Sequence, residues 1–292
     1  MDRKKKYAVF TMDVEDFTDT ECVSNAGVQI TQDMLDGLDE YIRLLEKYGI
    51  KATMFTICRT AQQVKEKLLQ YIERGHRIAL HGYQHVAPLL MDDERFRRET
   101  AEAKQLLEQE FRTEVRGYRA PCFSMDSNKL NILQKLGFRY DSSRLDFEPA
   151  RHTGKIDVSS FREVLNGVFC KNGFFEFGLA CQKVFGQKFP VSGGGYVRLS
   201  HWSFIMPMIQ RYLKQNDYYV FYLHPFEMSK VRPPAIRNLK MYDRYYLKCG
   251  LKTYRLKVEA IIKMLIAYGY TFVTFDELAD LIQQEPVCSA AL

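Results

Sequence analysis

Residues 7–16 read YAVFTMDVED and residues 52–57 read ATMFTI, and these two stretches decide the fold class. Both are rich in β-branched or aromatic residues, and both are bounded by charge or glycine. We therefore predict strands over residues 7–12 and 52–57. Between them, residues 31–48 carry apolar side chains at helical spacing, so the three elements form one β-α-β unit.

The same alternation continues along the chain. Predicted helices over 61–74 and 92–110 alternate with predicted strands over 77–80 and 114–118. Such an α/β order implies a parallel sheet with helices outside it, either doubly wound or closed into a barrel.

The second half is less regular. Residues from about 145 to 215 begin as short apolar pieces broken by proline and glycine, which predicts a loop- and hairpin-rich insertion and not a second domain. The simplest account is a single domain over residues 1–292, with its core motifs at 7–143 and 218–284. Regular elements are predicted again as helices over 202–215, 252–268 and 275–284 and as strands over 218–223 and 271–274.

Composition narrows the function classes. A hydrophobic content of 46% over 292 residues supports a well-buried core. No run of 18 apolar residues exists, and the first apolar run is too short for a secretory signal, so we expect a cytoplasmic protein. The seven cysteines include no CxxC pair, which fits reduced thiols.

The net charge of +6 reflects a local excess of basic residues in the second half of the chain. This basic excess suits a pyrophosphate-linked glycan or anionic headgroups, and it leaves room for peripheral contact with a membrane. No recognised nucleic-acid module accompanies it, so we expect no nucleic-acid partner. The residues are Arg232, Arg237, Lys240, Arg244, Lys248, Lys252, Arg255 and Lys257.

Polar residues gather where the predicted strands end. Active groups of parallel α/β folds collect at the carboxyl ends of the strands. The sequence places an acidic cluster after the first strand, HGYQH after the third, Arg119 after the fourth and His224 after the late strand. The acidic cluster consists of Asp13, Glu15 and Asp16.

Two of these groups predict a metal site. His81 and His85 are four residues apart, and on a helical turn this spacing brings two imidazoles close enough to hold one ion. A carboxylate from the acidic cluster would complete a catalytic set with open positions for water and substrate. Asp13 and Glu15 face the same way if the strand alternation continues, which leaves one carboxylate free as a general base. His224 is a candidate general acid.

The order of these residues resembles that of the NodB-homology polysaccharide deacetylases, carbohydrate esterase family four. Thr-x-Asp-x-Glu-Asp, His-x-x-x-His, Arg-x-Pro, Asp-Ser-Ser and Leu-His-Pro occur in the family's order over residues 11–225. Residues 189–199 and 221–227 resemble an exopolysaccharide-associated subgroup. The resemblance implies a distorted (β/α)7-type barrel and hydrolysis of an N-acetyl group with zinc or a similar divalent ion.

The resemblance also implies roles for the residues. It makes Asp13 the base, His81 and His85 metal ligands, Arg119 the residue that orients the base, and His224 the acid. It further places Asp141 beside Arg119 to hold the guanidinium.

The chain departs from the family pattern at three points. Val14 follows Asp13 where the family has adjacent aspartates, so the third ligand is Glu15 or Asp16, and relatives with an Asp-x-Asp arrangement favour Glu15. Pro225 replaces a carboxylate that often follows the acid histidine, which leaves Glu227 and Asp141 as candidates to orient His224. Cys122 replaces a tyrosine, although its backbone N–H can still face an oxyanion.

The expected activity is removal of an acetyl group from an N-acetylated sugar in a surface-polysaccharide or O-antigen precursor. One alternative is hydrolysis of a non-sugar amide, as in allantoinase-like relatives. The other is a non-catalytic glycan-binding protein, which the non-standard first motif and Pro225 favour. Two features favour the hypothesis that the substrate is a sugar. One is the glycine-rich segment at 189–199, and the other is the presence of aromatic residues that suit stacking on sugars, such as Tyr196, Trp202 and Tyr222.

Overall fold

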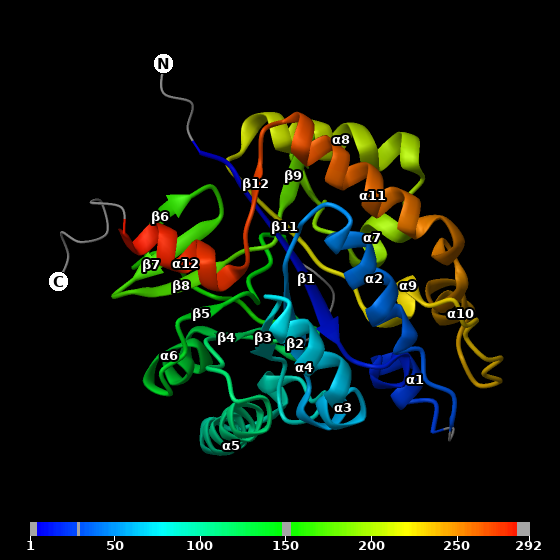
Figure 1. Ribbon diagram of the computed structural model, residues 1–292, viewed down its shortest axis with the longest axis horizontal. Coiled ribbons are helices and arrows are strands. Elements are labelled where there is room, and N and C mark those ends of the chain that lie inside the picture. The colour runs from blue at the N-terminus through cyan, green and yellow to red at the C-terminus, as the bar shows by residue number, and fades with distance from the viewer. Residues whose placement is uncertain (1–4, 28–29, 148–152, 285–292) are drawn as a thin grey trace.

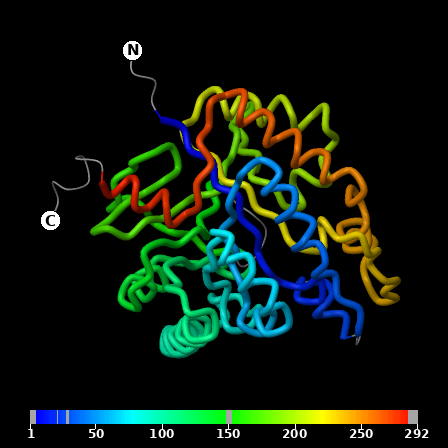
Figure 2. The backbone as a smooth tube through the Cα atoms, in the orientation of Figure 1, coloured from blue at the N-terminus to red at the C-terminus, as the bar shows by residue number. Residues whose placement is uncertain are grey.

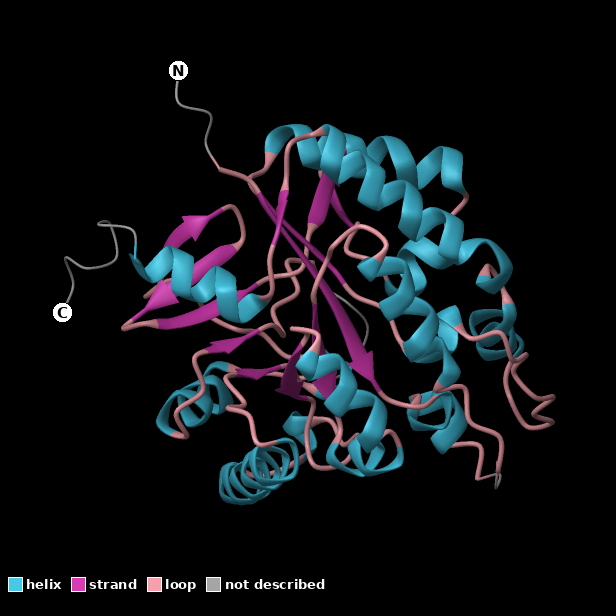
Figure 3. Ribbon diagram, viewed as in Figure 1, coloured by secondary structure: helices cyan, strands magenta, loops and turns pink. Residues whose placement is uncertain are grey.

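In a computed structural model that describes residues 5–27, 30–147 and 153–284, a curled sheet lies at the centre and helices surround it (Figures 1 and 3). Among the described residues, seven neighbouring strands run parallel in the order β11-β1-β2-β3-β4-β5-β8, in addition to the short strand β12, and this order is the one that the resemblance predicts for a (β/α)7-type barrel. They are β1 (Tyr7–Val14), β2 (Ala52–Thr56), β3 (Arg77–Leu80), β4 (Gly117–Tyr118), β5 (Tyr140–Asp141), β8 (Phe174–Phe177) and β11 (Tyr218–Phe221).

Strand β1 is the centre of this arrangement. It pairs with β11 on one side and, on the other, with β2 and with β12 (Thr271–Phe272) from the far end of the chain. Figure 2 shows the late strand β11, in yellow, running beside the dark blue of β1. The barrel is therefore assembled from both halves of the sequence.

Alternation along β1 divides its side chains between two cores. Phe10 and Met12 join the cluster that packs against the helices, whereas Val9 joins a second cluster with Phe55 and Phe177 from other strands. Successive side chains of a strand point to opposite faces, so this second cluster fills the inside of the curl. Asp13 continues the inward-facing set at the carboxyl end of the strand.

Helices cover the outside of the sheet, and one closes its amino end (Figure 1). Phe275 of α12 stacks on Phe177 at a ring-centroid distance of 4.6 Å, and its backbone N–H donates to Thr53 Oγ1. The carboxyl ends of the strands are left to form the site. The longer helices are α2 (Asp36–Glu46), α3 (Cys58–Gln63), α4 (Lys65–Glu73), α5 (Asp93–Phe111), α6 (Ser127–Lys135), α8 (Trp202–Gln215), α10 (Met241–Lys248), α11 (Leu251–Ala267) and α12 (Phe275–Gln284).

The irregular second half contains the predicted hairpins. Strands β6 (Arg162–Leu165), β7 (Val168–Lys171) and β8 form an antiparallel meander, and β9 (Cys181–Val184) pairs with β10 (Gln187–Pro190). The segment is more than the predicted insertion. Its strand β8 pairs parallel to β5 and is therefore a strand of the barrel itself.

Backbone hydrogen bonds then close the gap between β8 and β11. The N–H of Val191 donates to the carbonyl of Ala180, the N–H of Tyr222 donates to Ser192, and the N–H of Gly194 donates back to Tyr222. These bonds form a closing bridge over residues 191–194.

None of the helices in the described part of the chain combines the length and the apolar character that a membrane span requires.

The other predicted elements differ from the structure at the ends of both helices and strands, and the strand predicted over 114–118, for example, is only Gly117–Tyr118. Strand 77–80 and helices 202–215 and 275–284 have the predicted bounds. The helix predicted over 61–74 is two helices, because Val64 between them leaves helical geometry at φ −119° and ψ 22°. Short helices complete the chain: α1 (Glu21–Ser24), α7 (Gly194–Leu199) and α9 (Pro225–Met228).

Candidate active site

A cavity of about 950 Å³ opens at the carboxyl end of the barrel. Its floor contains most of the side chains that the sequence singled out, and it brings together groups more than 200 residues apart. The predicted site residues that line it are Asp13, Glu15, His81, His85 and His224.

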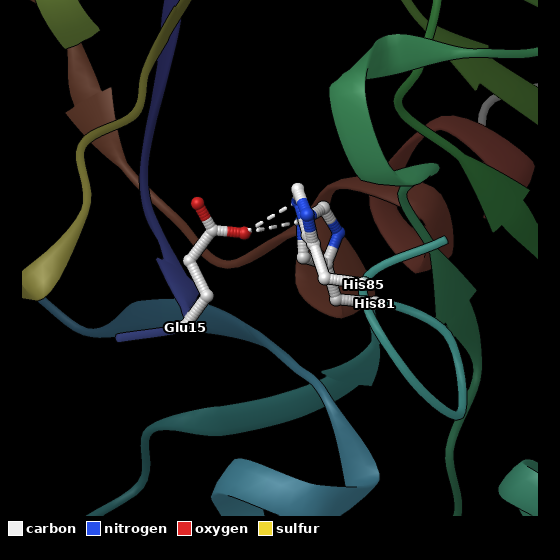
Figure 4. Close-up of side chains that lie close together, drawn as sticks. All are labelled: Glu15, His81 and His85. Atoms are coloured by element: carbon white, nitrogen blue, oxygen red, sulfur yellow. Dashed lines mark ion pairs between the residues drawn. The ribbon is translucent and has the colours of Figure 1, made fainter. Parts of the chain in front are cut away.

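Three of these residues converge on one point. Glu15 Oε2 lies 2.7 Å from His85 Nε2 and 3.4 Å from His81 Nε2, and Figure 4 shows both imidazoles facing this oxygen. Ligand atoms of the three residues all lie within 4.8 Å of one another, the one such cluster of His, Cys, Asp or Glu in the described residues. Glu15 Oε2 is buried and, in this part of the chain, accepts no hydrogen bond of good geometry.

This donor set fits a divalent cation. Two imidazoles and one carboxylate, with room left for water and substrate, are typical of catalytic zinc and related sites. Burial alone would raise the pKa of Glu15, but the nearby imidazoles of His85, His81 and His224 hold it well below its ordinary value. The carboxylate is therefore ionised and ready to bind a metal.

The two histidines are positioned by a loop. The prediction of a helical turn is wrong, because residues 81–85 form a bend in which Gly82 has φ +92°. A Cβ atom at Gly82 would lie 3.0 Å from the carbonyl oxygen of Gln84, so the tight turn favours glycine. His81 Nδ1 lies 2.8 Å from the carbonyl oxygen of Arg119, which leaves Nε2 to face Glu15.

Asp16, the alternative third ligand, has a structural role instead. Its carboxylate accepts hydrogen bonds from Thr18 Oγ1 at 2.7 Å and from the backbone N–H of Met34 at 2.9 Å. It thereby caps the short 3-10 helix Phe17–Asp19. The structure favours Glu15 as the ligand because only its carboxylate faces the two imidazoles.

Asp13 lies next to this cluster and is held by Arg119. The Nη1 atom of Arg119 donates to Asp13 Oδ1 at 2.6 Å and to Thr11 Oγ1 at 2.9 Å. The guanidinium is fully buried and lies 4.1 Å from the centroid of the Phe55 ring. The contact between Arg119 and Asp13 is the predicted one, and it fixes the direction of the carboxylate.

Asp141 does not hold the guanidinium, contrary to prediction. Ser142 does so, because its carbonyl accepts from Arg119 Nε at 3.1 Å and its hydroxyl oxygen accepts from Nη2 at 3.0 Å. Within the described residues, no ion pair joins Asp141 to Arg119; the carboxylate accepts from Ser143 and lies against Glu176. Burial, above all, raises the pKa of Asp141 to about 6 and that of Glu176 well above its ordinary value.

His224 completes the cavity from β11. Its Nε2 lies 3.6 Å from Glu15 Oε1, and its Nδ1 lies 3.2 Å from Glu227 Oε2. Glu227, one of the two candidates left by the sequence, is thus the carboxylate that orients it. Burial lowers the pKa of His224, but the hydrogen bond to Glu227 and the charge of Glu15 outweigh it and raise the pKa to about 9.

A comparison of the sequence with known families matches two models to the chain. Residues 21–140 match the family model described as polysaccharide deacetylase, and this stretch contains His81, His85 and Arg119. Over residues 21–140, the chain is therefore similar to the polysaccharide deacetylases. Residues 147–279 match a second model, described as a domain of unknown function (DUF3473), and this stretch contains His224 and Glu227.

Relatives of the deacetylase domain match over different lengths. A peptidoglycan deacetylase of Helicobacter pylori is 27% identical over 115 residues, which is 39% of this chain and 39% of that protein. A solved structure from Mycobacterium smegmatis, described as a polysaccharide deacetylase, has a TM-score of 0.62 at 17% identity and covers 97% of this chain and 92% of its own. An allantoinase has a TM-score of 0.59 at 13% identity and covers 96% and 91%. These structures share the barrel.

Part of the deacetylase site was not foreseen from the sequence. Arg198 is fully buried and donates from Nε to Glu227 Oε1 at 2.7 Å, although it follows a glycine run that we interpreted as a loop. Tyr196 and Tyr222 line the cavity as expected, whereas Trp202 lies beside a separate, smaller cavity. Lys240, which belongs to the predicted basic excess, lies on the rim around α10. The other residues of this rim were missed because they come from an irregular stretch: Asn238, Leu239, Tyr242, Asp243, Tyr245 and Tyr246.

Proposed function

We propose that this chain hydrolyses the acetamide group of an N-acetylated sugar in a bacterial surface-polysaccharide or O-antigen precursor, with zinc or a similar divalent ion. One observation carries the proposal. The Glu15–His81–His85 cluster shares a cavity with an oriented carboxylate, Asp13, and an oriented imidazole, His224.

Asp13 and His224 divide the proton transfers. Asp13, held by Arg119, accepts the proton of the attacking water as general base. Protonated His224, held by Glu227, donates a proton to the nitrogen of the leaving amine as the C–N bond breaks, which gives acetate and the free amino sugar. A divalent ion held by Glu15, His81 and His85 would polarise the acetyl carbonyl and lower the pKa of a water toward about 7.

The lining of the cavity supports a sugar as the substrate. Aromatic faces stack on the apolar faces of pyranose rings, and Tyr196 and Tyr242 are 43% and 70% exposed at the rim. Cys122 and Phe123 both have positive φ, 56° and 54°, and line the wall between the barrel and this rim. Such strained backbone clusters at ligand sites. The likeness to a peptidoglycan deacetylase supports the same substrate class, and a cytoplasmic precursor is part of the proposal.

The first experiment measures metal content and acetate release together. Purified protein should contain about one divalent ion per chain, and this content should fall strongly in His81→Ala and His85→Ala because each loses a ligand. Asp13→Asn should keep the ion and lose acetate release from N-acetylglucosamine oligomers by on the order of 100-fold or more. The matched control is His201→Ala, an exposed histidine outside this cavity.

Two results would contradict the proposal. Full metal content in both ligand variants would remove the metal site, and unchanged turnover in Asp13→Asn would remove the base. Turnover of allantoin without any release of acetate from sugars would favour the non-sugar amide instead.

A further inference from the structure

Positive charge is concentrated in one segment of the chain. Residues 230–257 contain nine Lys and Arg and a single acidic residue, Asp243, which gives this segment a net charge of +8. The whole chain has a net charge of only +6, so the remainder is slightly acidic. A segment of this kind attracts anionic partners through its own field.

Most of these cations are unpaired. Lys230 pairs with Glu40, and Lys257 donates to three backbone carbonyls, so both have roles within the fold. The other seven are exposed, and none forms an ion pair with another described residue. We call these seven residues the basic patch: Arg232, Arg237, Lys240, Arg244, Lys248, Lys252 and Arg255.

Exposed apolar side chains lie among these cations. On α10, Met241, Arg244, Tyr245 and Lys248 follow the spacing i, i+3, i+4 and i+7, which places them on one face of the helix. All four are exposed, Met241 by 87%, whereas Leu247 on the opposite side is buried. An exposed apolar side chain such as the thioether of Met241 adds no affinity for a soluble polyanion. A helix face that mixes cations with apolar and aromatic side chains suits a lipid–water interface.

The basic patch also borders the candidate active site. Lys240, Tyr242 and Tyr245 line the rim of the cavity. In Figure 1, α10, the loop before it and the start of α11 lie together at the right-hand edge of the molecule, where no other described element covers them. A surface bound at α10 would therefore be next to the mouth of the cavity.

We propose that α10 and the basic patch dock the protein on an anionic membrane surface, so that the cavity receives an N-acetylated sugar anchored to a lipid. The identity of the substrate in this proposal rests on the proposed function, whereas membrane binding itself does not. Basic side chains bind the anionic headgroups, and Met241 and Tyr245 enter the boundary between headgroups and acyl chains.

The test is co-sedimentation of the full chain with lipid vesicles. The protein should pellet with phosphatidylcholine vesicles that contain phosphatidylglycerol, should remain in solution with phosphatidylcholine alone, and should be released by added salt. The triple variant Arg237→Glu, Lys248→Glu, Lys252→Glu should lose vesicle affinity by on the order of 100-fold, because each basic residue contributes roughly fivefold. Met241→Ser should weaken binding by a smaller factor.

A matched variant places the same charge change elsewhere. Arg97→Glu, Arg98→Glu, Lys135→Glu alters exposed residues of α5 and α6, on a different part of the surface from α10, and should bind vesicles as the unmodified chain does. Acetate release from soluble N-acetylglucosamine oligomers should be the same in both triple variants, because none of these six residues lines the cavity.

The outcomes separate the two proposals. Equal vesicle binding by the patch variant and the unmodified chain, or equal losses in both triple variants, would overturn membrane docking. Binding to a soluble anionic polysaccharide but to no vesicle would overturn it as well and would assign the patch to a glycan. Failure of acetate release with intact vesicle binding would overturn only the proposed function.

Discussion

At the scale of single residues, His224, the proposed general acid, depends on a buried chain of charges. Arg198 and Glu227 are both fully buried and pair at 2.7 Å, and removal of either partner would leave an unpaired charge in the interior. Burial tends to raise the pKa of Glu227, but Arg198 and His224 keep it below its ordinary value. Glu227 therefore remains ionised and stabilises the protonated form of His224.

This relation gives a prediction about pH. A general acid must be protonated, so activity falls as the pH rises through the pKa of His224. Glu227→Gln removes the negative charge that raises this pKa, so the alkaline limb of kcat/KM should move to lower pH and kcat should fall by roughly 10- to 100-fold. The measurement is a pH profile of acetate release, with metal content and thermal unfolding checked in the same preparation. An alkaline limb at the same pH in both proteins would exclude this role of Glu227.

At the scale of elements, two buried carboxyl groups join β5 to β8. Asp141 and Glu176 are neighbours in register, both lie fully buried, and both have raised pKa values, about 6 for Asp141. Two carboxylates in contact cannot easily ionise together, so they retain a proton that the unfolded chain has already lost. Because the folded state then binds more protons, stability falls as the pH rises from about 4 through about 6.

Substitution of Glu176 by glutamine tests this pair. Gln keeps an acceptor for the backbone N–H of Arg144 and offers an N–H to Asp141, so Glu176→Gln should stabilise the protein at pH 8 by on the order of 2 kcal/mol and by less at pH 5. The control Glu163→Gln, an exposed glutamate on β6, should change stability by less than about 0.5 kcal/mol at either pH. Urea unfolding at both pH values measures the difference. Destabilisation at pH 8 would show that the pair is not repulsive.

The elements also show how far a sequence can be interpreted. Segments with strong periodicity and clear ends, such as Arg77–Leu80 and Phe275–Gln284, have the predicted bounds because local pattern alone determines them. The parallel pairing of β8 with β5 was not predictable, because the register between distant strands leaves no local signal. Helix α2 was predicted too long for a similar reason, because the residues before it make contacts with distant ones, such as the hydrogen bond from the backbone N–H of Met34 to Asp16 Oδ1.

The sequence predicted which residues belong to the candidate site better than it predicted how they are arranged. Residue type and position after a strand were sufficient to find Glu15, His81, His85 and His224. Whether Glu15 or Asp16 faces the two imidazoles depends on where the chain turns after β1, and that turn is fixed by the capping role of Asp16. Arg198 was missed because a buried cation cannot be recognised without its partner, which lies 29 residues away.

At the scale of the whole molecule, the closing bridge over residues 191–194 connects β8 to β11, the strand that carries His224 at its end. Gly193 in this bridge has φ +112°, and a Cβ atom there would lie 2.2 Å from the carbonyl oxygen of Tyr222. The backbone of the bridge must therefore move if the residue is replaced. The integrity of the barrel and the position of His224 depend on the same contact.

Gly193→Ala should consequently affect both stability and turnover. We expect a loss of at least about 3 kcal/mol in the free energy of unfolding, together with reduced acetate release. Gly186→Ala is the matched control, because Gly186 has φ +82° in the β9–β10 hairpin but no atom near its Cβ position; it should cost only roughly 1–2 kcal/mol from backbone strain. Denaturant unfolding separates the two, and equal losses would mean that the bridge tolerates displacement.

The neighbours of β1 also have a consequence for biosynthesis. The flank of this central strand that faces away from β2 pairs with residues that follow it by more than 200 positions, with Tyr218 opposite Tyr7. While the chain is still emerging from the ribosome, the histidine loop is complete long before that flank is covered, so the nascent polypeptide exposes a bare, apolar strand edge. Such an intermediate is prone to aggregate and folds slowly. A cell that makes this protein quickly therefore needs chaperones to keep partly folded chains from aggregating.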